Sequence, residues 1–232
     1  RRYATTLAVA MSPEERGLYE EASALVRSSY RQEKSAGKML LRTVQAELGS
    51  LPQAARAALE KLGPEGERLA RIAAGIAQTP KTRRLAELVR DFGEPLIVFT
   101  RFQKTHETLV RSLTDAGFPV ASLHGGMRRR EKEEALDRFR TSARVLVSTD
   151  VGSEGRNLQF VRAIVNFDLP WNPMRIEQRV GRIHRIGQER EVYVYNLSAE
   201  GTVEDYILWL LDAKINMFEL VIGEMDMILG NL

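Results

Sequence analysis

Arg182 and Arg185 are the residues whose type and spacing suggest chemistry most directly. They lie in the run QRVGRIHR, which begins at Gln178. In a helix, a spacing of three residues places both guanidinium groups on one face, where their planar forks can bind the oxygens of a phosphoryl group. Arginines that reach a nucleotide across a cleft stabilise the charge of the phosphoryl-transfer transition state. The run alone more often signifies a surface helix whose arginines form ion pairs, here with Glu177 and Glu189.

A glycine-bearing stretch after an apolar run is a second candidate for phosphate binding. The run VLVST ends at Thr149 and is followed by Asp150, Gly152 and Gly155. Glycine has no Cβ, so the backbone can approach a phosphate closely before a helical turn begins. Two glycines after a strand are common, and on spacing alone an ordinary loop is the more frequent interpretation.

Short β-branched runs alternate with helical patterns after Pro80, and this alternation predicts an α/β fold with a parallel sheet covered by helices on both faces. The expected strands are Leu96–Thr100, Pro119–Leu123, Val145–Thr149, Ala163–Phe167 and Val192–Leu197. The expected helices between them are Thr82–Phe92, Gln103–Ala116, Arg129–Phe139 and Pro173–Val180. Ligands of such sheets bind at the carboxyl ends of the strands. Polar residues are found at these ends, namely Thr100, Arg101, His124, Thr149, Asp150 and Asp168.

The N-terminal part has a helical pattern from Ser12 to about Gln78. Ser12, Pro13 and Glu15 form a helix start, with an N-cap residue, a proline at the first position and a glutamate at the third. We expect three or four helices, separated at Gly37, at Gly49–Pro52 and at Gly63. The predicted organisation is a helical subdomain over 1–80, an α/β domain over 81–201 and an apolar C-terminal helix over 202–232.

The composition is that of an ordinary globular protein. The 232 residues are 44% hydrophobic and 28% charged, with a net charge of +3, so the chain can bury a core. No apolar run is long enough for a membrane span, and no signal peptide is apparent. Cysteine is absent, which agrees with a cytoplasmic location and excludes thiolate metal sites. Arginines cluster at 128–144 and 175–190, but interleaved glutamates favour solvated helix faces there.

The three histidines do not predict a metal site. His124 and His184 lie within the motifs described here, and no third ligand stands at a recognisable spacing. His106 is expected on the surface of a helix.

Taken together, these motifs resemble the C-terminal lobe of the Swi/Snf family within helicase superfamily two. LIVFTRF, starting at Leu96, looks like motif IV, STDVGSEGRNL like motif V, DLPWNP like its extension, and QRVGRIHRIGQ like motif VI. SLHGGM and the basic helix after it resemble a further block of the same family. The resemblance covers Lys81 to Gly201 in matching order and implies a RecA-like lobe, with the helices before motif IV as the family's helical protrusion.

The resemblance implies roles in ATP hydrolysis for two groups of residues. Arg182 and Arg185 match the family's arginine fingers, and Gln178 matches the motif VI glutamine that orders the nucleotide. The residues expected to bind ATP are Gly152, Gly155 and Asn157. Glu154 departs from the glycine found in eukaryotic remodellers and, with SEGRNLQF, indicates a bacterial or archaeal branch such as the RapA type.

The resemblance also implies contacts with the backbone of double-stranded DNA. Hydroxyl, amide and guanidinium groups at strand ends can track phosphates without reading bases. The expected contacts are Thr100, Arg101, Gly125, Lys132, Ser148 and Thr149. Trp171 and Asn172 are expected to couple the nucleotide state to the grip on DNA, although Trp171 suits a core position equally well.

The sequence contains no GxxxxGK[ST] run and no DExH-like run after a strand. We therefore expect ATP with Mg²⁺ to be bound mainly by an N-terminal helicase lobe in cis. The chain itself is expected to be inactive without that lobe. The expected function is the second motor lobe of a double-stranded-DNA translocase that acts on a DNA-bound protein or RNA polymerase at the nucleoid, with no membrane partner. A strand-separating DNA or RNA helicase and a non-catalytic nucleic-acid-binding module remain alternatives.

Overall fold

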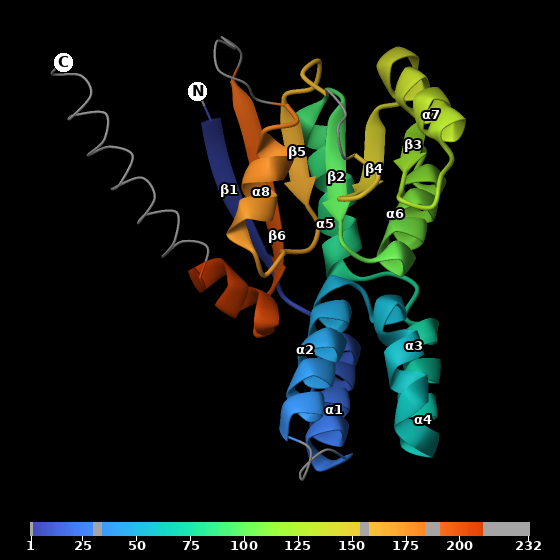
Figure 1. The fold of residues 1–232 in the computed structure, drawn as a ribbon, viewed down its shortest axis with the longest axis vertical. Helices are drawn as coiled ribbons and strands as arrows, with labels where there is room; N and C mark the ends of the chain where they lie inside the picture. The colour runs from blue at the N-terminus through green and yellow to red at the C-terminus, as the bar shows by residue number, and fades with distance from the viewer. Residues whose placement is uncertain (1, 30–33, 154–157, 184–190, 211–232) are drawn as a thin grey trace, which may run out of the picture.

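The computed structural model describes residues 2–29, 34–153, 158–183 and 191–210. Within them, six parallel strands form one sheet in the order β1-β6-β5-β2-β4-β3 (Figure 1). The strands are β1 (Arg2–Val9), β2 (Leu96–Thr100), β3 (Val120–Leu123), β4 (Val145–Thr149), β5 (Ala163–Asn166) and β6 (Val192–Ala199). The predicted α/β fold class is confirmed, and all five expected strands are present close to their expected bounds.

Helices cover both faces of the sheet, as the alternation of patterns predicts. α5 and α6 supply Leu85 and Leu109 to the core on one face, whereas α7 and α8 supply Phe139 and Ile176 to the core on the other. Each helix begins within two residues of its predicted start. Their bounds are α5 (Pro80–Phe92), α6 (Gln103–Asp115), α7 (Arg129–Thr141) and α8 (Pro173–Val180).

The central strands have no solvent-facing side. Ile97 and Phe99 of β2 point into one core, and Val98 between them points into the other. Every residue of β2 and β4 is buried. Because both faces of a parallel sheet carry helices, apolar residues occupy consecutive positions, which explains the continuous apolar runs in the sequence.

The strand β1 was not expected, and it corrects the predicted extent of the helical subdomain. It pairs in parallel with β6 along its whole length, with Arg2 opposite Val192 and Val9 opposite Ala199. Residues 2–9 therefore belong to the sheet, and the helices begin only at Pro13. An edge strand with several exposed side chains has no long apolar run by which the sequence could reveal it.

The helical subdomain follows β1 and lies beyond the carboxyl edge of the sheet (Figure 1). Its start agrees with the prediction, because the Glu15 backbone N–H donates to Ser12 Oγ (3.2 Å) and the Ser12 backbone N–H donates to the Glu15 carboxylate (2.9 Å). The elements are α1 (Pro13–Ser29), α2 (Lys34–Ser50), α3 (Arg56–Leu59) and α4 (Gly63–Gly75), with 3-10 turns at Pro52–Ala55 and Glu60–Leu62.

A buried ion pair connects this subdomain to the sheet. Lys81 in the first turn of α5 lies 2.7 Å from Glu204, and their side chains are only 5% and 2% exposed. The Lys81 ammonium also donates to the Gly49 carbonyl at the end of α2 (2.9 Å), while Glu204 accepts from the Ala199 backbone N–H at the end of β6 (2.8 Å). The pair therefore holds α2 in a defined place at the carboxyl edge.

Residues 203–210 are helical, and the rest of the predicted C-terminal helix lies outside the described residues. Ile207 is buried in the core, whereas Tyr206 and Trp209 are exposed and stacked on each other with ring centroids 5.9 Å apart. In the part of the chain that the structure describes, no helix is long and apolar enough to cross a membrane.

Candidate functional site

The site is organised by an ion pair between Asp150, just after β4, and Arg179 on α8. The Arg179 guanidinium donates to both carboxylate oxygens of Asp150, at 2.6 and 3.0 Å. It also donates to Asn166 Oδ1 at the end of β5 (2.8 Å) and lies over the Phe99 ring, 5.2 Å from its centroid. The Arg179 side chain is only 2% exposed. This pair fixes α8 against the ends of three strands.

Asp168 accepts hydrogen bonds from several elements at the carboxyl edge of the sheet. Its carboxylate accepts hydrogen bonds from the hydroxyls of Thr100 and Ser50 and from the Arg101 backbone N–H (2.8 Å). Ser50 is the last residue of α2, and its hydroxyl also lies 2.8 Å from Thr105 Oγ1. The carboxylate therefore joins the helical subdomain to β2 and β5.

Neither Asp168 nor the pair of Asp150 and Arg179 was assigned a role from the sequence. Asp150 and Asp168 were recognised only as polar residues at strand ends, and Arg179 stands inside the motif that drew attention to its neighbours. The signal that could have found them is charge at a position flanked by buried residues, because a buried charge must be paired.

These interactions change the interpretation of three predicted DNA contacts. Thr100 and Ser148 are fully buried, and their hydroxyls donate to Asp168 and to the Thr149 carbonyl. Thr149 is 8% exposed, and its Oγ1 accepts from the Gly152 backbone N–H (3.2 Å). The side chains of Thr100 and Ser148 therefore have no open path to a phosphate, and we attribute to them the positioning of the strand ends instead.

The glycines Gly152 and Gly125 are explained by packing between two loops. A Cβ at Gly152 would lie 2.5 Å from the Leu123 carbonyl oxygen and 2.8 Å from His124 Cα, which leaves no room for a side chain. A Cβ at Gly125 would lie 3.0 Å from Val151 Cγ1. The close approach that requires glycine at 152 is thus to the end of β3, and a role of Gly152 in ATP binding stays a prediction.

The motif VI residues lie on the face of the sheet that α8 covers. Gln178 lines a pocket of about 290 Å³ together with Asp150, Val151, Asn172 and Arg175. Arg182 follows α8, and its carbonyl accepts from the Leu158 backbone N–H (3.1 Å), so the described end of motif V meets motif VI. The Arg182 side chain is partly exposed and forms no ion pair with any described residue, in contrast to Arg179.

Three predicted site residues, Gly155, Asn157 and Arg185, lie outside the described residues. Lys132 is half-buried on α7. The arginines near it pair with glutamates one turn away, as in Arg129 with Glu133 (3.0 Å), which supports the prediction of a solvated helix face in that region.

Trp171 lies between the sheet and the helical subdomain. Its half-buried ring packs against the core beneath α8, and the Arg42 guanidinium of α2 lies over it, 5.7 Å from the centroid. Asn172 caps α8, because its side-chain oxygen accepts from the Met174 backbone N–H (3.0 Å). Both expected interpretations of Trp171, a core contact and a coupling position, fit this placement.

The prediction for His106 was wrong, because it is 2% exposed. Its Nε2 lies 3.1 Å from the Val147 carbonyl oxygen, and its ring packs edge-on against His124. Burial lowers the pKa of His106, so the neutral form is favoured. Among the described residues no group of three potential ligands could hold a metal ion.

Comparison with known families agrees with this geometry. The profile of the family "Helicase conserved C-terminal domain" matches residues 80–187, from the first residue of α5 to beyond Arg182. Residues 80–187 belong to the helicase C-terminal domain family. The match includes β2 to β5, and it confirms the predicted resemblance to a helicase C-terminal lobe.

Two curated relatives extend the match beyond the family profile. The "Uncharacterized ATP-dependent helicase YqhH" of Bacillus subtilis is 38% identical over the whole of this chain, which spans 43% of that protein. The "RNA polymerase-associated protein RapA" of Vibrio parahaemolyticus is 35% identical over 54% of this chain and 13% of its own length. The chain thus spans less than half of either relative.

A solved structure supports the fold assignment. The Sulfolobus solfataricus "SWI2/SNF2 ATPase core in complex with dsDNA" superimposes with a TM-score of 0.71 over 97% of this chain and 47% of the other, at 22% identity. The similarity confirms the RecA-like fold of the helicase lobe, with the helical subdomain included in the matched part.

Proposed function

We propose that this chain is the second motor lobe of an ATP-dependent translocase on double-stranded DNA. In this proposal Arg182, together with Arg185, reaches the γ-phosphate of ATP bound by an N-terminal lobe of the same protein. Exposed groups at the strand ends, such as Arg101, contact the DNA backbone. The identity with YqhH supports ATP hydrolysis by the whole protein, and the fold shared with the SWI2/SNF2 core supports duplex DNA as the track.

The observation that carries the proposal is the contrast between neighbouring arginines. Arg179 is bound to Asp150 and has no freedom to reach a nucleotide. Arg182, three residues later, is partly exposed and lies beside the end of motif V. A partly exposed guanidinium that forms no ion pair with a described residue can stabilise developing phosphoryl charge when the lobes close.

ATP is the substrate of this reaction, and the described residues fit its phosphates better than its metal ion. Gln178 and Arg175 line one pocket as a polar and a cationic group, and Arg182 follows α8 as a further cation. The carboxylate oxygens of Asp150 both accept from Arg179, so this acid is not a free ligand for Mg²⁺. We therefore assign the magnesium ligands to the N-terminal lobe, while this lobe contributes cationic groups.

The test is the ATPase activity of the whole natural protein. Replacing Arg182→Ala should lower the DNA-stimulated turnover number by roughly a thousandfold or more, the effect typical of losing an arginine finger. Arg111→Ala on α6, an exposed arginine far from α8, is the matched control and should keep the wild-type rate. Circular dichroism should show that both variants fold.

Unchanged turnover in Arg182→Ala would refute the arginine-finger assignment. Absence of any stimulation by duplex DNA in the wild-type protein would instead refute the translocase and favour a non-catalytic module. A fork substrate distinguishes the remaining alternative, because a translocase leaves the strands paired whereas a strand-separating helicase does not. The relationship to RapA makes RNA polymerase the first protein partner to test.

A further inference from the structure

We propose that one strand of the duplex lies in a groove shared by α2 and the carboxyl edge of the sheet, and that Lys38 and Arg42 of α2 bind its phosphates. This inference rests on the proposed function and adds to it, because it gives the helical subdomain a direct part in holding DNA. None of the motifs described above includes these two residues.

The groove is continuous because three adjoining pockets share their lining. The first, of about 400 Å³, lies between α2 and the end of β2, and it shares Arg101 and Trp171 with the second, of about 190 Å³. The second shares Asn172 and Arg175 with the pocket of about 290 Å³ beside Gln178. The first two pockets therefore adjoin along a line from α2 across the strand ends, and this line ends beside the third pocket, to which the proposed function assigns the nucleotide phosphates.

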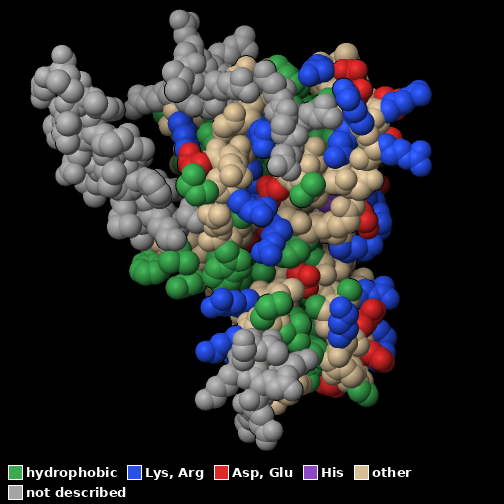
Figure 2. Space-filling model, in the orientation of Figure 1, with side chains coloured by type: hydrophobic (Ala, Val, Ile, Leu, Met, Phe, Trp, Pro, Cys, Tyr) green, Lys and Arg blue, Asp and Glu red, His purple; other side chains and the backbone are tan. Residues whose placement is uncertain are grey.

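The exposed lining of this path contains four cations, together with the apolar side chains of Met39 and Val151. Lys38, Arg42, Arg101 and Arg175 are all exposed and line it. In the view of Figure 2, basic side chains are visible both over the sheet and on the helices below it. Asp150 is the acid in the lining, and its charge is offset by the buried Arg179.

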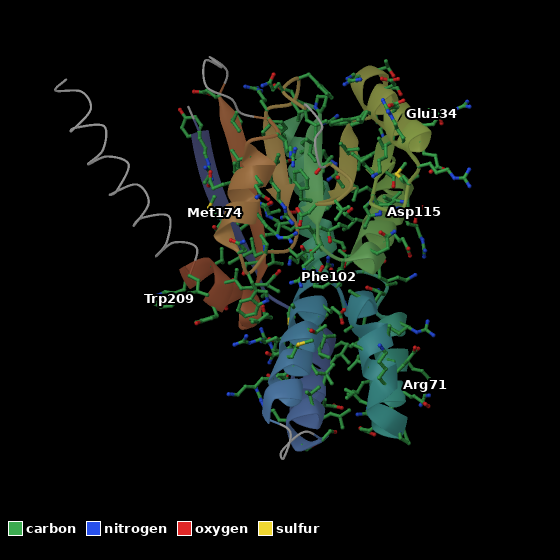
Figure 3. All side chains as sticks on the ribbon, viewed as in Figure 1. Arg71, Phe102, Asp115, Glu134, Met174 and Trp209 are labelled. Atoms are coloured by element: carbon green, nitrogen blue, oxygen red, sulfur yellow. The ribbon has the colours of Figure 1, made fainter. Side chains whose placement is uncertain are left out.

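The aromatic groups of the groove offer little open apolar surface. Trp171 and Phe102 are half-buried, and each ring has a guanidinium over it, that of Arg42 at 5.7 Å and that of Arg101 at 5.5 Å. Figure 3 shows Phe102 at the junction between the sheet and the helices. The charge of the lining, with four exposed cations and the single acid Asp150 already paired with Arg179, therefore favours a sugar-phosphate backbone.

α2 is held firmly enough to keep its cations over the groove. Its last residue, Ser50, donates to Asp168 (3.0 Å), and the Gly49 carbonyl accepts from the buried Lys81. Lys38 and Arg42 are four residues apart and therefore lie on the same face of the helix. Because the anchors are at the strand ends, this face is positioned by the sheet itself.

The experiment measures the affinity of the whole natural protein for a duplex of about 20 base pairs as the salt concentration varies. Each cation that no longer neutralises a phosphate should reduce the slope of log K against log salt by about 0.9. The double variant Lys38→Gln, Arg42→Gln should therefore lower the slope by roughly 1 to 2 and weaken binding about tenfold or more at low salt. Arg42→Lys should keep most of the slope, because it keeps the charge.

The matched control is Arg71→Gln, Arg111→Gln, which removes the same charge from two exposed arginines outside the groove. Figure 3 shows Arg71 on α4, away from the junction. A wild-type slope in the groove variant, or an equal reduction in the control, would overturn the proposal. Weaker binding to an acidic peptide but not to duplex would also overturn it. If the wild-type protein binds no duplex, the proposed function itself fails.

Discussion

The Asp150–Arg179 pair illustrates how a single buried interaction determines which residues around it remain available. Both carboxylate oxygens are occupied by one guanidinium, which also holds Asn166. The exposed Arg175 approaches the same carboxylate at 3.5 Å, but its side chain is 55% exposed. The buried Arg179 is therefore interpreted as structural, whereas the exposed Arg175 remains available to a ligand.

Replacing Arg179→Ala should destabilise the chain by roughly 3–5 kcal/mol, because it leaves Asp150 without its buried partner. The control Arg175→Ala contacts the same carboxylate from the surface and should cost about 1 kcal/mol or less. Urea unfolding followed by circular dichroism measures both. Equal destabilisation in the two variants would contradict the structural role of Arg179.

Glu47, near the end of α2, predicts a dependence of stability on pH. Burial raises the pKa of Glu47 to about 7, although Arg101 and Lys61 favour its charged form, and one carboxylate oxygen has no hydrogen-bond partner in the structure. A carboxyl group whose pKa is raised on folding stabilises the fold while protonated, so this contribution is present below about pH 4.5 and is lost as the pH rises through 7.

Glu47→Gln should therefore be more stable than the wild type at pH 8, and the difference should shrink towards pH 5. Thermal unfolding of both proteins at a series of pH values measures this difference in stability. Glu67→Gln, at an exposed position of α4, is the control and should show no such trend. A constant difference between Glu47→Gln and the wild type across this range would show that burial does not raise the pKa.

At the scale of elements, the attachment of α2 to the sheet determines whether the helical subdomain can act with the lobe. Its polar contacts include the Lys81–Glu204 pair and the hydrogen bonds of Ser50. In addition, Arg42 lies over the Trp171 ring, and Leu51, which follows α2, packs in the core of the sheet. Polar contacts of this kind specify one orientation through their directions, whereas the apolar core of the subdomain is built from its own helices.

Lys81→Met should destabilise the chain by roughly 3–5 kcal/mol, since Glu204 would keep an uncompensated buried charge. Burial also raises the pKa of Glu204, which Lys81 counteracts. In the double variant Lys81→Met, Glu204→Leu both charges are removed, and a large part of the stability should be recovered. A double variant less stable than the single one, in denaturant titrations, would contradict this account.

At the scale of the whole molecule, the lobe presents two surfaces that the parallel sheet holds at fixed positions. The carboxyl edge and α2 form the groove, and the pocket beside α8 is lined by Gln178. Arg175 and Asn172 line both the pocket beside Gln178 and the neighbouring pocket beside Trp171. In the proposed function, a rigid lobe with these adjacent surfaces transmits closure on a nucleotide to a shift on a strand without unfolding any element.

The sequence by itself determined the order of strands and helices from Pro80 onward and the start of α1. Continuous apolar runs, capping residues and short loops are local signals, and the structure agrees with them closely. The motif residues also identified the family. The edge strand β1 could not be predicted because its partner β6 is distant in the sequence and its exposed side chains leave no apolar pattern.

Only the tertiary structure decided which polar residues are internal. Thr100, Ser148 and His106 are hydrogen-bonding side chains that suit a surface equally well in a sequence, and burial depends on elements that pack over them. The same holds for Arg179 and Arg182, which have the same side chain three residues apart. Arg179 pairs with Asp150 at the end of another strand, whereas Arg182 pairs with no carboxylate of the described residues, because the pairing of charges is set by distances in space.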